Sequence, residues 1–262
     1  FLVDEFQCLI SDASFKGRTD LEFLKMLDGN AQNICYMSAT PIESTYLDAL
    51  GEFRNCTYYK LKWDPNVVVE PTVNSILMRK GDTPITIFSD IIRDFRRNGY
   101  FAKKIINGQE CRSTEAVVFI NEVKTILKII LQNDLMPTET TILISESNKE
   151  VKRLESLGFT VGEQCADMNN PVNKTFTFCS KASFEGRDFY STNAFTYIFL
   201  DGTKDWQTHD TSIEVPQMLG RQRLDINQFK YNATIYYRTK PCIENQNEFL
   251  TKMSEKLTDS QT

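Results

Sequence analysis

The sequence predicts an α/β protein with parallel sheets, built from two α/β units joined by an irregular middle segment. Short apolar runs, typical of buried strands, alternate along the chain with amphipathic stretches at helical spacing. Apolar residues make up 41% of the 262 residues, which is enough for a buried core. No internal repeat of short period is present.

The first unit is expected over residues 1–56. Phe1–Val3 is a predicted strand that ends on Asp4-Glu5, and Ile34–Met37 is a second strand that ends at S-A-T. Helices are expected at Thr19–Leu27 and in the stretch that follows Pro41. Because the chain begins at Phe1 inside an apparent strand, we expect it to be a piece of a longer protein.

Residues 57–112 differ in character and are interpreted as a connector or inserted element. Strands are expected in T-Y-Y-K-L-K-W (57–63) and V-N-S-I-L (73–77), followed by a turn at Lys80-Gly81-Asp82. A helix is expected over 83–104, with Pro84 near its start and Gly99 near its end.

The second unit is expected over residues 113–240, and a closing helix with a polar tail over 241–262. Within it, apolar runs predict strands and periodic stretches predict helices. The expected strands lie at 116–120, 140–145, 174–180, 194–202 and 232–239, and the expected helices at 122–135, 148–158 and 212–224.

Composition excludes several classes of function. A net charge of -5 excludes a basic nucleic-acid coat, so that any such contact requires a local patch. A single histidine argues against a zinc site or a histidine-based triad. Seven irregularly spaced cysteines indicate reduced thiols in a cytoplasmic protein. No apolar run reaches membrane-spanning length and no signal peptide is visible, so no membrane partner is expected.

Polar residues follow both strands of the first unit, where ligands collect in parallel sheets. Of the two carboxylates Asp4 and Glu5, one could hold Mg²⁺ while the other activates a water, although a solvated acidic turn is the alternative. Ser38 and Thr40 could bond to neighbouring loops, or could simply cap the helix that follows.

Two polar stretches of the second unit are further candidates. In Phe178–Phe189 a strand runs into a loop in which Gly186 allows close backbone approach to a phosphate, or forms an ordinary turn. In V-P-Q-M-L-G-R-Q-R-L-D (215–225), Gln217 and Arg221 share one face at helical spacing. Arginine suits bidentate contact with phosphate, although a surface ion pair is the alternative.

The order of these four motifs resembles that of the superfamily 2 helicases. V-D-E-F-Q (3–7) looks like their motif II and S-A-T (38–40) like motif III, while S-K-A-S-F-E-G-R-D-F (180–189) looks like motif V and Q-M-L-G-R-Q-R (217–223) like motif VI. The resemblance implies the remainder of a first RecA-like lobe and a complete second RecA-like lobe. ATP would bind between them, and a nucleic-acid strand would cross both.

The resemblance also implies roles for individual residues. Asp4 would bind Mg²⁺ and Glu5 would activate the hydrolytic water. Gln7, Ser38 and Thr40 would couple the nucleotide state to strand binding, and Gly186 and Asp188 would lie near the ribose. Gln217, Arg221 and Arg223 would face the γ-phosphate of ATP as catalytic residues.

Three features depart from the family pattern. Gln7 stands where many relatives carry Asp or His. The last arginine of motif VI usually comes three residues after the first, whereas Arg223 comes only two after Arg221. On an unbroken helix these two side chains would point to opposite sides. Finally, no phosphate-binding loop G-x-x-x-x-G-K-[ST] occurs in the chain, so this piece alone is expected not to hydrolyse ATP.

The middle segment carries a basic cluster that could contact nucleic acid. The segment from Arg79 to Arg112 contains eight Lys and Arg residues but only four Asp and Glu residues. Phe95, Tyr100 and Phe101 could stack on bases, or could belong to the core below a solvated helix face. The candidate contacts are Arg93, Arg96, Arg97, Lys103 and Lys104.

The main hypothesis is therefore part of an ATP-dependent helicase or translocase, acting on DNA rather than RNA. The G-R-x-R spacing is similar to that of origin-binding proteins of large DNA viruses, which suggests a phage or mobile-element source and replication proteins as partners. A helicase-like binding module that does not hydrolyse ATP is the alternative, and a generic α/β domain with coincidental motifs is the third hypothesis.

Overall fold

The structure is a computed structural model. It describes residues 1–6, 19, 22–27, 33–38, 53, 56–62, 64, 66–145, 149–162, 168, 173–183, 187–204, 211 and 214–239.

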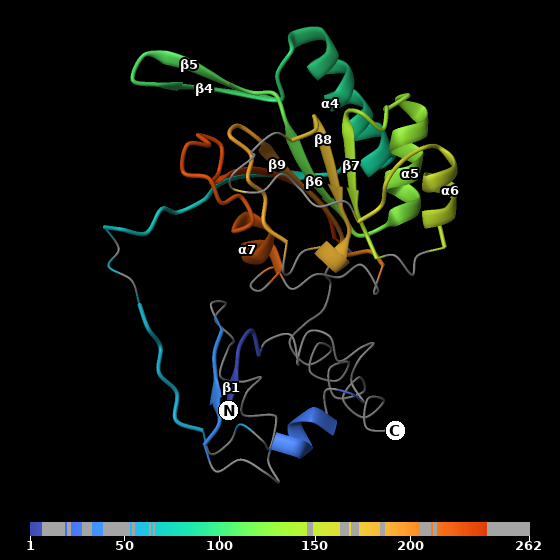
Figure 1. The fold of residues 1–262 in the computed structure, drawn as a ribbon. Helices are drawn as coiled ribbons and strands as arrows, with labels where there is room; N and C mark the ends of the chain where they lie inside the picture. Colours follow the sequence, from blue (N-terminus) through green and yellow to red (C-terminus); the bar gives the residue numbers. More distant parts are fainter. Residues whose placement is uncertain are drawn as a thin grey trace.

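A six-stranded parallel sheet forms the core of the larger unit of the described chain (Figure 1). Every neighbouring pair is parallel, and Val118 in its middle lies opposite Phe178 on one side and Tyr197 on the other. This confirms the predicted α/β class with a parallel sheet flanked by helices. From edge to edge the strands are β3 (Thr72–Leu77), β10 (Asn232–Arg238), β9 (Phe195–Asp201), β6 (Ala116–Ile120), β8 (Phe176–Cys179) and β7 (Thr140–Leu143).

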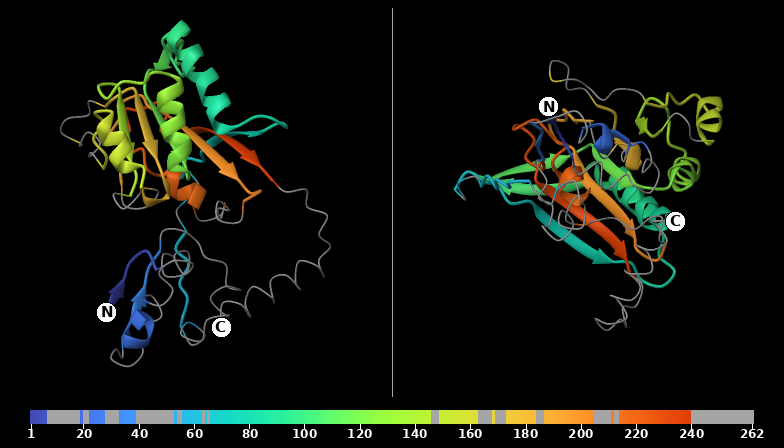
Figure 2. Two further views of the ribbon diagram at one scale, coloured as in Figure 1. Left: turned by 90° about the vertical axis from the view of Figure 1, so that its right-hand side faces the viewer. Right: turned by 90° about the horizontal axis from the view of Figure 1, so that it is seen from below.

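Helices cover both faces of this sheet (Figure 2). Because side chains alternate along a strand, Val118 of β6 packs with α4 (Pro84–Asn98), α5 (Val123–Gln132) and α6 (Val151–Ser156). Its neighbour Phe119 packs on the opposite face with α7 (Glu214–Leu219). Burial of the strands on both faces explains why they appear in the sequence as continuous apolar runs.

Helix α4 has clear start and stop signals in the sequence. Thr83 caps it with a reciprocal capping box to Thr86, and Pro84 occupies its first turn. Gly99 ends it in the left-handed conformation, with φ of +79°. The helix buries Phe88, whose ring makes edge-on contacts with four aromatic rings of the sheet.

The expected connector over 57–112 is corrected in part by the structure. β3 is the edge strand of the six-stranded sheet, in parallel register with β10, and α4 packs against α5. Residues 72–98 therefore belong to the second unit. The strand expected over 57–63 does not form in residues 57–62, where Leu61 is 93% exposed.

The helix expected over 83–104 ends at Asn98, and a hairpin follows it. β4 (Ala102–Ile106) and β5 (Gln109–Ser113) form a separate antiparallel pair. Asn107 and Gly108 join them with φ of +51° and +79°. Positive φ at both central residues is what the type I′ turn of a two-residue hairpin requires, and Asn-Gly is its strongest sequence signal.

The N-terminal residues form a smaller unit. β1 (Leu2–Val3) pairs in parallel with β2 (Cys35–Tyr36), and residues 22–27 are helical. The rings of Phe6, Tyr36 and Phe53 pack together with centroid separations of 5.0–5.8 Å. The helices expected after Pro41 and over 245–257 lie outside the described residues.

Candidate functional site

The two strand ends of the N-terminal unit are neighbours. Because β1 and β2 are parallel, Asp4-Glu5 and Ser38 follow them at the same edge. The backbone N–H of Phe6 donates to the carbonyl oxygen of Met37 at 3.1 Å, which holds the two segments together beyond the strands. The Glu5 N–H donates to Asp4 Oδ1 at 2.9 Å, and Glu5 has a positive φ of 52°. Gln7 and Thr40 lie outside the described residues.

The arginine motif does not continue the helix as expected. α7 covers only Glu214–Leu219, and the helix predicted over 212–224 is therefore wrong beyond Leu219. Gly220 N–H still donates to Pro216 O at 2.9 Å, but Gln222 already forms a parallel bridge with Phe189. Two backbone bonds flank this bridge: Phe189 N–H donates to Arg221 O at 2.8 Å, and Arg223 N–H donates to Phe189 O at 2.9 Å.

This change of backbone decides where the two arginines point. On a helix, residues two apart diverge, whereas in an extended segment they project to the same side. Arg221 and Arg223 accordingly both contact Asp188, while Gln222 between them is buried and accepts from Asn227 Nδ2 at 3.4 Å.

The resulting cluster joins residues of the two polar stretches at 180–189 and 217–223. Arg223 Nε lies 2.8 Å from Asp188 Oδ1, and Arg221 Nη1 lies 3.5 Å from the same oxygen. Arg221 Nη2 also donates to Gln217 Oε1 at 2.6 Å. The Arg221 side chain is only 9% exposed, whereas that of Arg223 is 48% exposed. Arg221 is thus fixed by the fold, and Arg223 remains accessible from solvent.

A buried ion pair supports the start of α7 from the loop after β8. Glu214 is 5% exposed, and Lys181 Nζ of the short 3-10 helix η2 (Lys181–Ser183) lies 2.6 Å from its Oε1. The backbone N–H of Lys181 donates in turn to Asn121 Oδ1 at 3.3 Å, just after β6. Gly186, which lies between this loop and Asp188, is outside the described residues.

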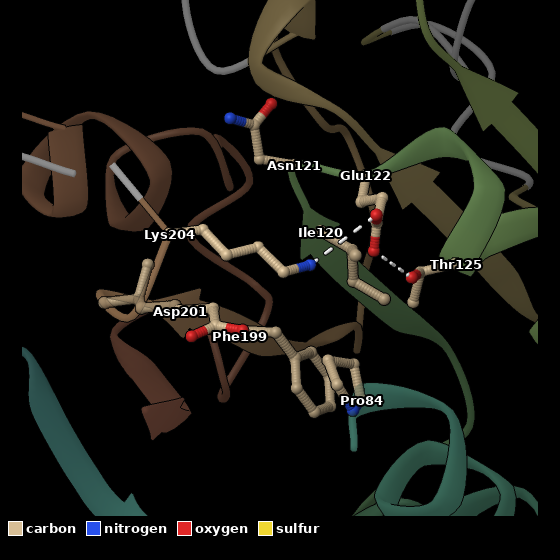
Figure 3. A pocket seen from close by; sticks show the side chains of 9 residues that line it. Pro84, Ile120, Asn121, Glu122, Thr125, Phe199, Asp201 and Lys204 are labelled. Carbon is tan, nitrogen blue, oxygen red and sulfur yellow. Dashed lines mark hydrogen bonds and ion pairs between the residues drawn. The ribbon is translucent and has the colours of Figure 1, made fainter. Parts of the chain in front are cut away.

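A pocket opens at the carboxyl ends of β6 and β9 (Figure 3). The chain leaves these neighbouring strands toward opposite edges of the sheet, so the pocket lies at a topological switch point, where α/β folds commonly bind ligands. Glu122 Oε2 accepts from Thr125 Oγ1 at 2.5 Å, and Glu122 Oε1 lies 3.6 Å from Lys204 Nζ. Asp201 Oδ1 accepts from the backbone N–H of Thr203 at 3.1 Å.

The sequence analysis did not single out these pocket residues. Asn121-Glu122 and Asp201-Gly202 each follow an apolar run directly, and this position at a strand end was the available signal. Within the described part of the chain, no group of three or more His, Cys, Asp or Glu side chains is placed to hold a metal ion. A Mg²⁺ bound through Asp4, phosphate oxygens and waters would not require such a group.

The basic residues of the middle segment divide between a helix and the hairpin. Arg93, Arg96 and Arg97 are exposed on α4, where Arg93 pairs with Asp90 and Arg97 with Asp94. Lys103 and Lys104 are exposed on β4.

The aromatic residues of this segment lie mostly in the core. The rings of Phe95 and Phe101 stack on one another at 4.1 Å and meet Phe176 edge-on. This geometry matches the alternative of core aromatics.

No protein-family model matches the chain, and no curated protein is significantly similar to it. Among the described residues, no helix is long and apolar enough to cross a membrane.

Proposed function

We propose that this chain is part of an ATP-dependent nucleic-acid helicase or translocase that acts on DNA and hydrolyses ATP between two RecA-like lobes. The observation that carries the proposal is the convergence of Arg221 and Arg223 on Asp188. Two guanidinium groups at one point form a donor set that suits the charge and geometry of a phosphate. Arg221 is held by Gln217 and is the more buried member of the pair.

The N-terminal unit supports the same proposal. Asp4 and Glu5 leave β1 next to Ser38, as a nucleotide-binding edge requires. The Asp4 carboxylate is exposed and would suit Mg²⁺, which favours oxygen ligands and retains waters. Bound ATP supplies the phosphoryl group, Glu5 orients the attacking water, and the arginines neutralise charge on the phosphate.

The proposal requires a phosphate-binding loop, which this chain does not contain. The 262-residue chain alone is therefore expected to show no ATP hydrolysis with or without DNA. A full-length protein that includes such a loop is expected to hydrolyse ATP, and DNA is expected to stimulate it more than RNA.

Substitutions test the assigned roles in that full-length protein. Because an arginine at the γ-phosphate contributes about 10³–10⁵ in rate in related phosphoryl transfers, Arg221→Ala should lower kcat by at least about 10³. Glu5→Gln should lower kcat while leaving nucleotide affinity similar. Arg153→Ala, on an exposed position of α6, is the matched control. Hydrolysis that survives both Glu5→Gln and Arg221→Ala would contradict the proposal.

A non-hydrolysing binding module is the second candidate. In this alternative Asp188 remains the counter-ion of Arg221 and Arg223, and neither arginine meets a nucleotide phosphate. DNA binding without ATP hydrolysis by the full-length protein would select this alternative.

A further inference from the structure

The β4–β5 hairpin projects from the sheet, and its base is attached to the domain (Figures 1 and 2). An isolated two-stranded hairpin is marginally stable, so its base needs support. The backbone N–H of Phe101 donates to Ser113 O at 2.8 Å, and the Phe101 ring stacks in the core. Lys104 Nζ reaches Gln228 O and Asn232 Oδ1, both at 3.3 Å. One face of the ribbon is therefore fixed against the domain.

The other face is solvent-exposed and basic. The register places Lys103 directly opposite Arg112, and Ile105 opposite Glu110. The side chains of Lys103 and Arg112 are 56% and 57% exposed, and Ile105 is 73% exposed. Like charges at directly opposite positions destabilise a strand pair, which makes this arrangement unfavourable for the hairpin alone.

Two neighbours hold the cations in place. Glu110 Oε1 lies 2.7 Å from Arg112 Nε, and Glu110 Oε2 lies 3.8 Å from Lys103 Nζ. The Tyr100 ring lies beneath both cations, with its centroid 5.2 Å from Arg112 Cζ and 5.9 Å from Lys103 Nζ. The ribbon thus presents two oriented cations beside one carboxylate on one surface, a net positive charge in a chain whose net charge is -5.

From this geometry we infer that the β4–β5 hairpin binds the backbone of duplex DNA, with Lys103 and Arg112 each contacting a phosphate at the edge of the major groove. This inference rests on the nucleic-acid part of the proposed function and assigns a surface to it. A two-stranded ribbon fits the major groove of B-form DNA, which is about 12 Å wide, whereas the deep and narrow major groove of A-form RNA does not admit it.

The same residues argue against single-stranded nucleic acid as the ligand. Binding of single strands relies on aromatic platforms that stack on bases. Phe95 and Phe101 stack on each other in the core, and two cations occupy the Tyr100 ring. This face of the hairpin can therefore recognise nucleic acid through contacts of its cations with backbone phosphates.

The salt dependence of DNA binding by the 262-residue chain tests the inference. The double substitution Lys103→Gln with Arg112→Gln removes both contacts. Each lost phosphate contact reduces the slope of log K against log salt by about 0.9, so the slope should fall by about 1.8. Lowering the salt from about 200 to about 50 mM should then strengthen wild-type binding roughly 12-fold more than binding by the variant.

A matched control removes two charges elsewhere. Lys152→Gln with Arg153→Gln alters two exposed cations of α6 and should leave the slope unchanged. Circular dichroism and thermal melting verify that both variants fold. Fluorescence anisotropy is measured with duplex DNA, duplex RNA and single-stranded DNA of one length.

Selective loss of duplex DNA binding in the hairpin variant supports the inference. Equal slopes in both variants, no duplex binding by the wild type at 50 mM salt, or equally strong variant-sensitive binding to duplex RNA or single strands would overturn it. ATP hydrolysis by the full-length protein is scored separately. If hydrolysis depends on Arg221 but the hairpin substitutions do not change DNA binding, only this inference is contradicted. If DNA binding depends on the hairpin but the full-length protein does not hydrolyse ATP, only the proposed ATP hydrolysis is contradicted.

Discussion

Asp188 is the counter-ion of both arginines, and the substitution Asp188→Asn tests this role. The change keeps the size of the side chain and one acceptor oxygen but removes its charge. At the 3.5 Å separation from Arg221, the Coulomb attraction is about 5 kcal/mol for an effective dielectric constant of about 20. Desolvation of the arginine, which is 9% exposed, offsets much of this attraction.

Removal of one partner from a fully buried pair costs about 3–5 kcal/mol. Because Asp188 is 32% exposed and Arg221 retains its bond to Gln217, we expect a loss of about 1–3 kcal/mol. In a chain of this size, 2 kcal/mol corresponds to a decrease in Tm of about 4–8 °C. Asp90→Asn, which breaks an exposed pair with Arg93, is the control and should cost less than about 0.5 kcal/mol.

The same variant also tests whether the site accepts phosphate. Without the Asp188 carboxylate, the guanidinium groups of Arg221 and Arg223 have no shared anion. Inorganic phosphate can then bind between them in its place. At a phosphate concentration five times the Kd, binding stabilises the folded state by about 1 kcal/mol. Thermal melting in phosphate and in chloride of equal ionic strength should show this gain in Asp188→Asn and a smaller one in the wild type. Adding Arg221→Ala to the variant should abolish it.

Two results would refute this reasoning. One is an Asp188→Asn variant as stable as the wild type, which would mean that the ion pairs contribute nothing. The other is an equal response to phosphate in the wild type, in Asp188→Asn and in the double variant, which would show that the anion acts elsewhere on the chain.

Two further predictions concern the core and its pH dependence. Phe88 is fully buried among aromatic rings, so Phe88→Ala should cost about 3–5 kcal/mol in urea unfolding, and a loss below about 1 kcal/mol would contradict the packing. Burial raises the pKa of Glu115 above its usual value of 4.5, against the lowering effect of the hydrogen bond that Ser191 Oγ donates to it. Since its folded pKa lies above its unfolded pKa, wild-type stability falls as pH rises from the unfolded to the folded pKa. Glu115→Gln lacks this loss and should gain in free energy of unfolding relative to the wild type as the pH rises above the usual pKa of 4.5, whereas a difference that stays constant with pH would contradict the assignment.

The second unit could be predicted well because its signals are local. Its strands are buried on both faces and stand out as apolar runs. Thr83, Pro84 and Gly99 mark the ends of α4 through capping, which depends on adjacent residues. Such features do not depend on the rest of the fold.

The misassigned segment depends on long-range pairing. β3 belongs to the sheet because it pairs with β10, which lies far along the sequence, and all six of its residues are exposed at the sheet edge. Nothing in its own residues indicates that partner. The hairpin, in contrast, had a local signal in Asn107-Gly108, but its strands carry too many charges to show an apolar alternation.

In the arginine motif, whether two side chains point to the same side depends on the conformation of the backbone as well as on their spacing in the sequence. Two arginines three residues apart share a face on a helix, whereas arginines two residues apart share a side only when extended. Here α7 ends at Leu219, and Gly220 follows it at a position where a Cβ would lie only 3.3 Å from Pro216 O. The bridge between Phe189 and Gln222 then extends the chain and aligns Arg221 with Arg223. Because α7 ends before Arg221, the two guanidinium groups lie on one side of the chain and share Asp188.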